Sequence, residues 1–179
     1  VIEHSTDTAR KVLITGKGRC NVTNDCSGEE VLRNVPRNGR FLYSALDAFP
    51  PQSIIRFFEE NGCPLKTERG NRVFPVSDKS SSVLECLQRK LKQCGVTVKT
   101  ARVLGIRTLD GAVCGVCTTT ENIDAESVIL ATGGFGANLE MVSELKPELD
   151  GFMTTNAPGL LGQGIKMAEA IGAATVDMD

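Results

Sequence analysis

Apolar residues recur along the chain at helical spacing in two well-defined segments. Between Pro51 and Gly62, Ile54, Phe57 and Phe58 repeat at intervals of three and four residues. This spacing predicts a helix with one apolar face, a proline in its first position and a glycine at its end. The segment 51–62 is therefore predicted to be an amphipathic helix.

A second helix is predicted after residue 80. Leu84, Leu87 and Leu91 lie on one helical face, and Ser82 and Glu85 have the spacing of a capping box at the start of a helix. A third helical pattern runs from 164 to 171 and ends at a glycine.

Extended segments alternate with these helices. They are predicted at 1–3, 11–15, 65–76, 96–100, 103–109, 112–118 and 127–131. Asp110-Gly111 is a strong turn signal between two of them, and 127–131 is a continuous apolar run, typical of a strand covered on both faces. The pattern predicts an α/β fold with a parallel sheet and one small antiparallel β piece around 101–118. We expect a single domain over 1–179, with a helix and hairpin segment around 26–80.

Composition narrows the class of protein. The 179 residues are 41% hydrophobic, and 20 basic against 22 acidic side chains give a net charge of −2, so neither nucleic acid nor an anionic membrane is an expected partner. No apolar run approaches the ~18 residues of a membrane-spanning helix. The odd number of cysteines, seven, and the lack of a signal peptide predict reduced thiols and a cytoplasmic protein. With His4 as the only histidine and no clustered ligands, no metal site is expected.

Two glycine-rich stretches carry the chemical signal. They lie at 16–24 and 128–134, and each follows a predicted strand. A dinucleotide lying across strand ends needs close backbone approach, because main-chain N–H groups hold its pyrophosphate. The two stretches therefore indicate a dinucleotide cofactor.

Alternatives remain for the individual residues. Glu3 ends a predicted strand, where an acidic side chain binds a ribose hydroxyl in dinucleotide-binding folds, although it could also be an ordinary strand end. The stretch 16–24 lacks P-loop spacing. Its glycines, cation and short polar side chains suit an anionic cofactor, or else its polar groups satisfy their own backbone. Cys20 is either a buried thiol or a redox-active one.

A family resemblance adds to this interpretation. Residues 10–24 (RKVLITGKGRCNVTN) and 71–79 (NRVFPVSDK) resemble two signatures of the BaiN-type NAD(P)/FAD-dependent oxidoreductases. The segments 131–138, 155–159 and 162–168 resemble the soluble fumarate reductase and flavocytochrome c flavoproteins. One departure is Gln163, where that family usually has aspartate.

The resemblance implies a Rossmann-like, glutathione-reductase-like FAD-binding domain. It implies electron donation by NAD(P)H and a small-molecule acceptor such as an activated C=C bond, and it names no catalytic residue. The residues that it assigns to the cofactor are Glu3, Lys11, Gly16, Gly18, Arg19, Cys20, Asn21, Thr23, Val103, Ala131, Thr132, Gly133, Gly134, Gly162 and Gly164.

The resemblance also predicts that this chain is a central piece of a flavoenzyme. The family's first strand and its G-x-G-x-x-G helix would precede Val1, and its substrate-clamping part would follow Asp179. Two rival hypotheses are a non-catalytic fragment and a binding or assembly module without redox function. The sequence does not indicate an oligomeric state.

Overall fold

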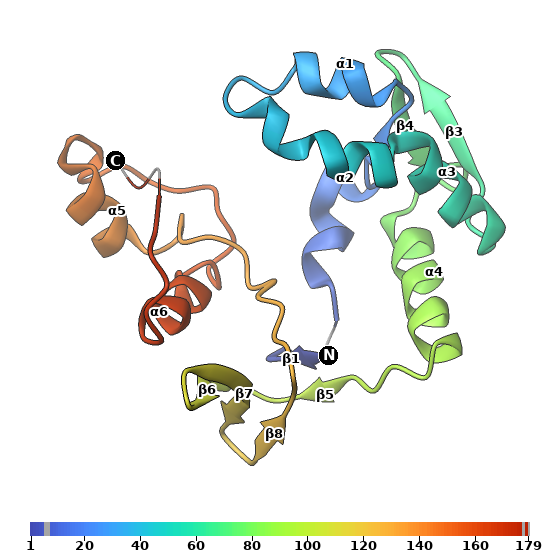
Figure 1. The fold of residues 1–179 in the computed structure, drawn as a ribbon. Coiled ribbons are helices and arrows are strands. Elements are labelled where there is room, and N and C mark those ends of the chain that lie inside the picture. The colour runs from blue at the N-terminus through green and yellow to red at the C-terminus, as the bar shows by residue number, and fades with distance from the viewer. Residues whose placement is uncertain (6–7, 177, 179) are drawn as a thin grey trace. The chain divides into compact units, whose positions relative to one another are not determined.

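The described residues form two compact units in a computed structural model (Figure 1). The structure describes residues 1–5, 8–176 and 178. The first unit contains Val1 and residues 8–98, and the second contains residues 2–5 and the described residues from Lys99 onward. The single domain predicted over 1–179 stays a prediction.

The first unit combines short helices with an antiparallel sheet. Its elements are the 3₁₀ helix η1 (Arg10–Gly18), β2 (Thr23–Asn24), α1 (Gly28–Arg33), η2 (Gly39–Leu42), α2 (Tyr43–Ala48), α3 (Pro51–Glu60), β3 (Leu65–Glu68), β4 (Arg72–Pro75) and α4 (Ser80–Gln93). The strand order is β2-β4-β3, and both pairings are antiparallel. Val73 in the central strand faces Thr23 on one side and Thr67 on the other.

The core of this unit is small and rich in sulfur. It is built from Cys20, Phe58, Cys63, Val83 and Cys86, all buried. Free cysteine packs as a small apolar side chain, so these thiols fill the space between α3, α4 and the loop before β2.

Both helices predicted in this unit exist, but the details of the second one differ. α3 begins at Pro51 and ends at Glu60, as its apolar spacing predicts. α4 begins at Ser80, so Ser82 lies inside the helix and the predicted capping box is wrong. The buried face carries Val83 and Cys86, because the side that meets η1 and α3 is set by packing and not by the leucine spacing.

The segment 11–15 was predicted to be extended, and this prediction is wrong. It belongs to η1, which packs against α4. The Ser80 hydroxyl donates to the Leu13 carbonyl at 2.9 Å, and the Thr15 hydroxyl donates to the Val12 carbonyl at 2.7 Å. These side-chain bonds, one local and one from α4, satisfy backbone carbonyls that a strand would have placed in a sheet.

The second unit holds the parallel pair and the second antiparallel sheet. Its elements are β1 (Ile2–Glu3), β5 (Lys99–Thr100), β6 (Val103–Leu109), β7 (Ala112–Thr118), β8 (Asn122–Asp124), α5 (Leu139–Leu145), the 3₁₀ helix η3 (Pro147–Leu149) and α6 (Gln163–Glu169). β1 pairs with β5 in parallel, and β6-β7-β8 form an antiparallel meander. The predicted turn is confirmed: Asp110 and Gly111 both have positive φ, 50° and 79°. The fold class is therefore α/β, as predicted.

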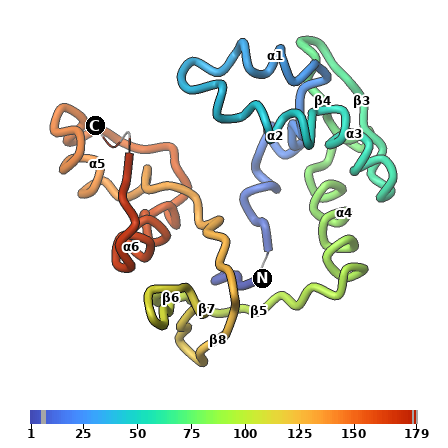
Figure 2. The backbone as a smooth tube through the Cα atoms, in the orientation of Figure 1, coloured from blue at the N-terminus to red at the C-terminus, as the bar shows by residue number. Residues whose placement is uncertain are grey.

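The apolar run 127–131 is not a strand, which corrects the sequence prediction. Figure 2 shows the chain leaving β8 on an extended path before α5. No described strand pairs with it, and Ile129 is 92% exposed. An apolar run is buried as a strand only where neighbouring strands and helices cover it.

The helices in the part of the chain that the structure describes are all too short or too polar to span a membrane.

Candidate functional site

The residues assigned to a cofactor fall into two sets, one in each unit. In the first unit, apart from Lys11 and Thr23, they lie in the last residues of η1, where the backbone is kinked and not helical at 15–17, and just after η1. Gly16, Lys17, Gly18 and Cys20 all have left-handed backbone, with φ of 54°, 58°, 84° and 60°. Two backbone hydrogen bonds between residues near in sequence close the loop. Arg19 N donates to Gly16 O at 3.3 Å, and Cys20 N donates to Thr15 O at 3.1 Å. We call residues 16–20 the left-handed loop.

This loop requires glycine at its first position. A Cβ on Gly16 would lie 3.0 Å from the backbone nitrogen of Asn21, inside the normal contact distance. Consecutive turns of left- and right-handed backbone form concave surfaces of N–H groups, a known way to bind anions. The left-handed loop is therefore compatible with a phosphate group.

The two signature segments meet in this unit. Val22 N donates to Val73 O at 2.9 Å, and Asp25 N donates to Asn71 O at 2.7 Å. β2 also pairs with β4. The structure thus joins the 10–24 and 71–79 segments, which are distant in the sequence.

Arg19 faces the β3–β4 hairpin. Its Nη2 donates to Glu68 Oε2 at 2.6 Å, and its Nε lies 3.4 Å from Asp78 Oδ1. Its guanidinium carbon lies 4.1 Å from the centre of the Phe74 ring, within cation–π distance. Lys66 Nζ lies 2.6 Å from Asp78 and 3.3 Å from Glu68. The sequence analysis predicted a cofactor contact for Arg19 and did not predict its contacts with Glu68, Phe74 and Asp78.

The other predicted residues of the loop differ in exposure. Cys20 is buried with Cys63 and Cys86 in the core, and burial raises the pKa of the Cys63 and Cys86 thiols. Lys11 and Asn21 are exposed, and Thr23 is half-buried in β2. The buried position of Cys20 is that of a packing residue.

In the second unit, the structure brings two glycine-rich segments together. Gly162 N donates to Gly134 O at 3.2 Å, and Ala137 N donates to Leu160 O at 3.0 Å. The Asn138 side chain adds a bond to Leu161 O at 3.2 Å while its Oδ1 caps α5 by accepting from Met141 N. The predicted residues of 131–134 and 162–164 thus share one surface.

Glycines make this contact close. A Cβ on Gly164 would overlap Thr132 Oγ1. Gly162 has φ 77°, and a Cβ there would lie 2.9 Å from Phe135 Cβ. By contrast, a Cβ on Gly134 would meet nothing within 4 Å, so the space beside its backbone is open. A ligand could approach the main chain closely at this point.

Glu3 and Val103 lie near each other through the parallel pair. The Glu3 carbonyl accepts from Ala101 N at 2.9 Å, directly after β5, and β6 starts at Val103. The Glu3 carboxylate is 26% exposed and accepts from Ser5 N at 3.0 Å. It is held at the end of β1, and its contact with a ribose hydroxyl stays a prediction.

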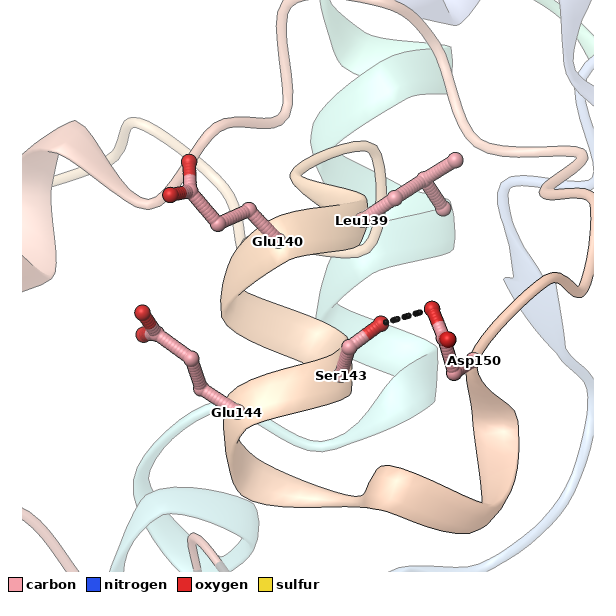
Figure 3. Close-up of a pocket in the computed structure, with 5 residues that line it drawn as sticks. All are labelled: Leu139, Glu140, Ser143, Glu144 and Asp150. Carbon is pink, nitrogen blue, oxygen red and sulfur yellow. Dashed lines mark hydrogen bonds between the residues drawn. The ribbon is translucent and has the colours of Figure 1, made fainter.

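An acidic concavity on α5 was not predicted from the sequence. Figure 3 shows Leu139, Glu140, Ser143, Glu144 and Asp150 around it, with Ser143 Oγ donating to Asp150 Oδ1 at 3.1 Å. Three carboxylates line this surface. Within the part of the chain that the structure describes, no group of three ligands is arranged to hold a metal ion.

Comparison with known proteins places the chain. Residues 1–140 match the family described as the HI0933-like protein Rossmann domain. A 3-dehydro-bile acid delta(4,6)-reductase of Clostridium scindens is 29% identical over 134 residues, which are 75% of this chain and 32% of that protein. An NADH:fumarate oxidoreductase of Klebsiella pneumoniae is 54% identical over 56 residues, or 31% of this chain and 6% of that protein.

A solved structure shares the fold. The open conformation of a flavocytochrome c3 fumarate reductase has a TM-score of 0.66 and 23% sequence identity, and the match covers 97% of this chain and 36% of that one. The chain spans well under half the length of each of these proteins. The Rossmann-like α/β fold inferred from the sequence is confirmed by both matches. The chain belongs to the HI0933-like protein Rossmann domain family.

Proposed function

We propose that this chain is part of an FAD-dependent oxidoreductase that passes hydride from NAD(P)H to a small organic acceptor, with an activated C=C bond as the leading candidate. FAD, when bound, supplies the hydride chemistry. The residues of this chain bind and orient it. The observation that carries the proposal is the close backbone contact between 131–134 and 162–164.

This contact fits a dinucleotide. Gly134 carries no side chain, and no atom lies within 4 Å of the place where one would begin. Neighbouring Gly133 has φ 75°, a conformation that glycine adopts without strain. A main chain that is open on one side and tightly packed on the other suits a flat ligand held by backbone groups.

The names of the relatives support a reductase. They include fumarate reductases of Shewanella frigidimarina, a urocanate reductase of Eggerthella lenta and an NADH:acrylate oxidoreductase of Vibrio harveyi. Fumarate, urocanate and acrylate all contain a C=C bond conjugated to a carboxylate. Two of the related enzymes have NADH in their names, which favours a reduced nicotinamide as donor.

An absorption spectrum tests the proposal. The purified chain is mixed with FAD, desalted and scanned for flavin bands, and its melting temperature is measured with and without FAD. FAD at 100 times its dissociation constant would stabilise the protein by about 2.7 kcal/mol. A colourless protein with no change in melting temperature would contradict cofactor binding by this chain and favour the rival hypothesis of a non-catalytic fragment.

A glycine variant sharpens the test. Gly134→Val has room in the fold, so we expect unchanged circular dichroism and melting temperature but at least tenfold weaker FAD binding, because the side chain fills the open space beside the backbone. Gly159→Val is the matched control, since a Cβ there also meets nothing within 4 Å and this residue is not assigned to the cofactor. Equal FAD affinity in the two variants would exclude cofactor approach at Gly134.

A further inference from the structure

Four charged side chains form a closed group beside the left-handed loop. Arg19 and Lys66 supply two positive charges, and Glu68 and Asp78 supply two negative charges. Each cation contacts both carboxylates, at N–O distances between 2.6 and 3.4 Å. The group is neutral as a whole. A hydrogen bond from Lys66 lowers the pKa of Asp78, so this carboxylate is held in its charged form.

The Arg19 guanidinium contacts three residues, Glu68, Phe74 and Asp78. Glu68 accepts from one end of the guanidinium, and the Phe74 ring lies against its plane at 4.1 Å. The Nε atom is buried and, among the described residues, has no hydrogen-bond partner that meets normal geometry. Moving the guanidinium toward an anionic ligand would break the Glu68 bond, the Asp78 contact and the ring contact together.

The loop on which Arg19 stands needs such an anchor. Lys17 and Cys20 are not glycine, yet both have left-handed backbone. Such residues are strained, and they persist only where the surrounding structure holds them in place. Arg19 lies between Gly18 and Cys20, and its partners all belong to β3, β4 and the residues just after β4. Its side chain therefore ties the loop to the hairpin.

We propose that Arg19 is a positioning residue: it holds the left-handed loop in shape by clamping the β3–β4 hairpin, and it does not itself pair with the cofactor. This differs from the cofactor contact inferred for Arg19 from the family resemblance. It also links the segments 10–24 and 71–79, since Arg19 of the first contacts Phe74 and Asp78 of the second. The importance of this role for the flavin rests on the proposed function, but the clamp itself does not.

Hydrogen exchange tests the clamp without any cofactor. The amide of Cys20, bonded to Thr15 O, reports on closure of the loop. Arg19→Met keeps a long side chain but removes the charge, and Glu68→Gln removes the strongest partner and leaves Arg19 intact. We expect both variants to speed exchange of the Cys20 amide by about fivefold or more, and the double variant to be little worse than either. Arg33→Met is the control, because Arg33 is exposed and, in the described part of the chain, its ion pair is with Glu29 on its own helix.

FAD affinity then separates positioning from direct contact. If Arg19 acts through the hairpin, Glu68→Gln weakens FAD binding in the same direction as Arg19→Met, and Arg19→Lys restores part of it. If Arg19 pairs with the cofactor, Glu68→Gln frees the guanidinium and binding is unchanged or tighter. The second result, or unchanged exchange in both variants, would overturn the proposal. A wild-type chain that binds no FAD would count against the proposed function alone, since the exchange experiment would still decide the clamp.

Discussion

The contact between Gly164 and Thr132 makes the sharpest prediction about the second unit. These residues lie in different glycine-rich segments, and a Cβ on Gly164 would overlap Thr132 Oγ1 while lying 3.3 Å from its Cβ and 3.4 Å from its Cγ2. Thr132 can turn its hydroxyl, but its methyl group then meets the same new atom. The substitution Gly164→Ala therefore forces a real shift of one segment against the other.

Two opposing effects set the change in unfolding free energy that Gly164→Ala causes. Overpacking by one methyl group costs about 1–3 kcal/mol. Gly164 lies in the first turn of α6, where alanine gains up to about 1 kcal/mol over glycine in helix propensity. We therefore expect Gly164→Ala to lower the free energy of unfolding by about 0–2 kcal/mol. In a Thr132→Ala background the hydroxyl and methyl are gone, and the same change should be neutral or raise the free energy of unfolding by up to about 1 kcal/mol.

The coupling between the two sites is the quantity to measure. Urea unfolding of the four proteins, followed by far-UV circular dichroism because the chain has no tryptophan, yields a double-mutant cycle. Exchange of the Gly162 amide, which is bonded to Gly134 O, reports on the same unit if the two units unfold separately. We expect a coupling of about 1–3 kcal/mol. Gly28→Ala at the start of α1, where a Cβ meets only ordinary contacts, is the unstrained control.

Independence of the two substitutions would refute this reasoning. If Gly164→Ala has the same effect with threonine or alanine at 132, then the two segments are not in contact and the shared surface is wrong. The candidate cofactor surface of the second unit would then lose its structural basis.

Three further predictions concern the first unit. A hydrogen bond from Lys66 lowers the pKa of Asp78 below its ordinary 3.8. The charged carboxylate therefore stabilises the fold above pH 3.8, and this stabilisation is lost as the pH falls through the lowered pKa. In urea unfolding, the stability of Asp78→Asn should depend less on acid pH than that of the wild-type chain. Since burial raises the pKa of Cys63, its thiol should react with a disulfide reagent far more slowly than exposed Cys94, and equal rates would contradict the buried core. Phe58→Ala should cost about 3–5 kcal/mol in unfolding free energy, and a loss below 1 kcal/mol would show that the site is not packed.

The sequence by itself determined the elements whose signals are local. The helix at 51–60 follows from apolar spacing behind Pro51, and the β6–β7 hairpin follows from Asp110-Gly111. The α/β class and the two glycine-rich stretches were also visible, because turn residues and periodicity depend on neighbours in the chain. These features need no knowledge of distant contacts.

Only the tertiary structure decided the features that depend on distant partners. The segment 11–14 is helical and packs against α4, and 127–131 is mostly exposed because no described strand lies beside it. The partners of Arg19 come from residues 68 to 78, and Gly164 meets Thr132 across more than thirty positions. Periodicity carries no information about which surfaces meet. Packing and charge pairing between distant segments decide which surfaces meet. In this chain they determine that Gly164 packs against Thr132 and that Arg19 pairs with Glu68 and Asp78.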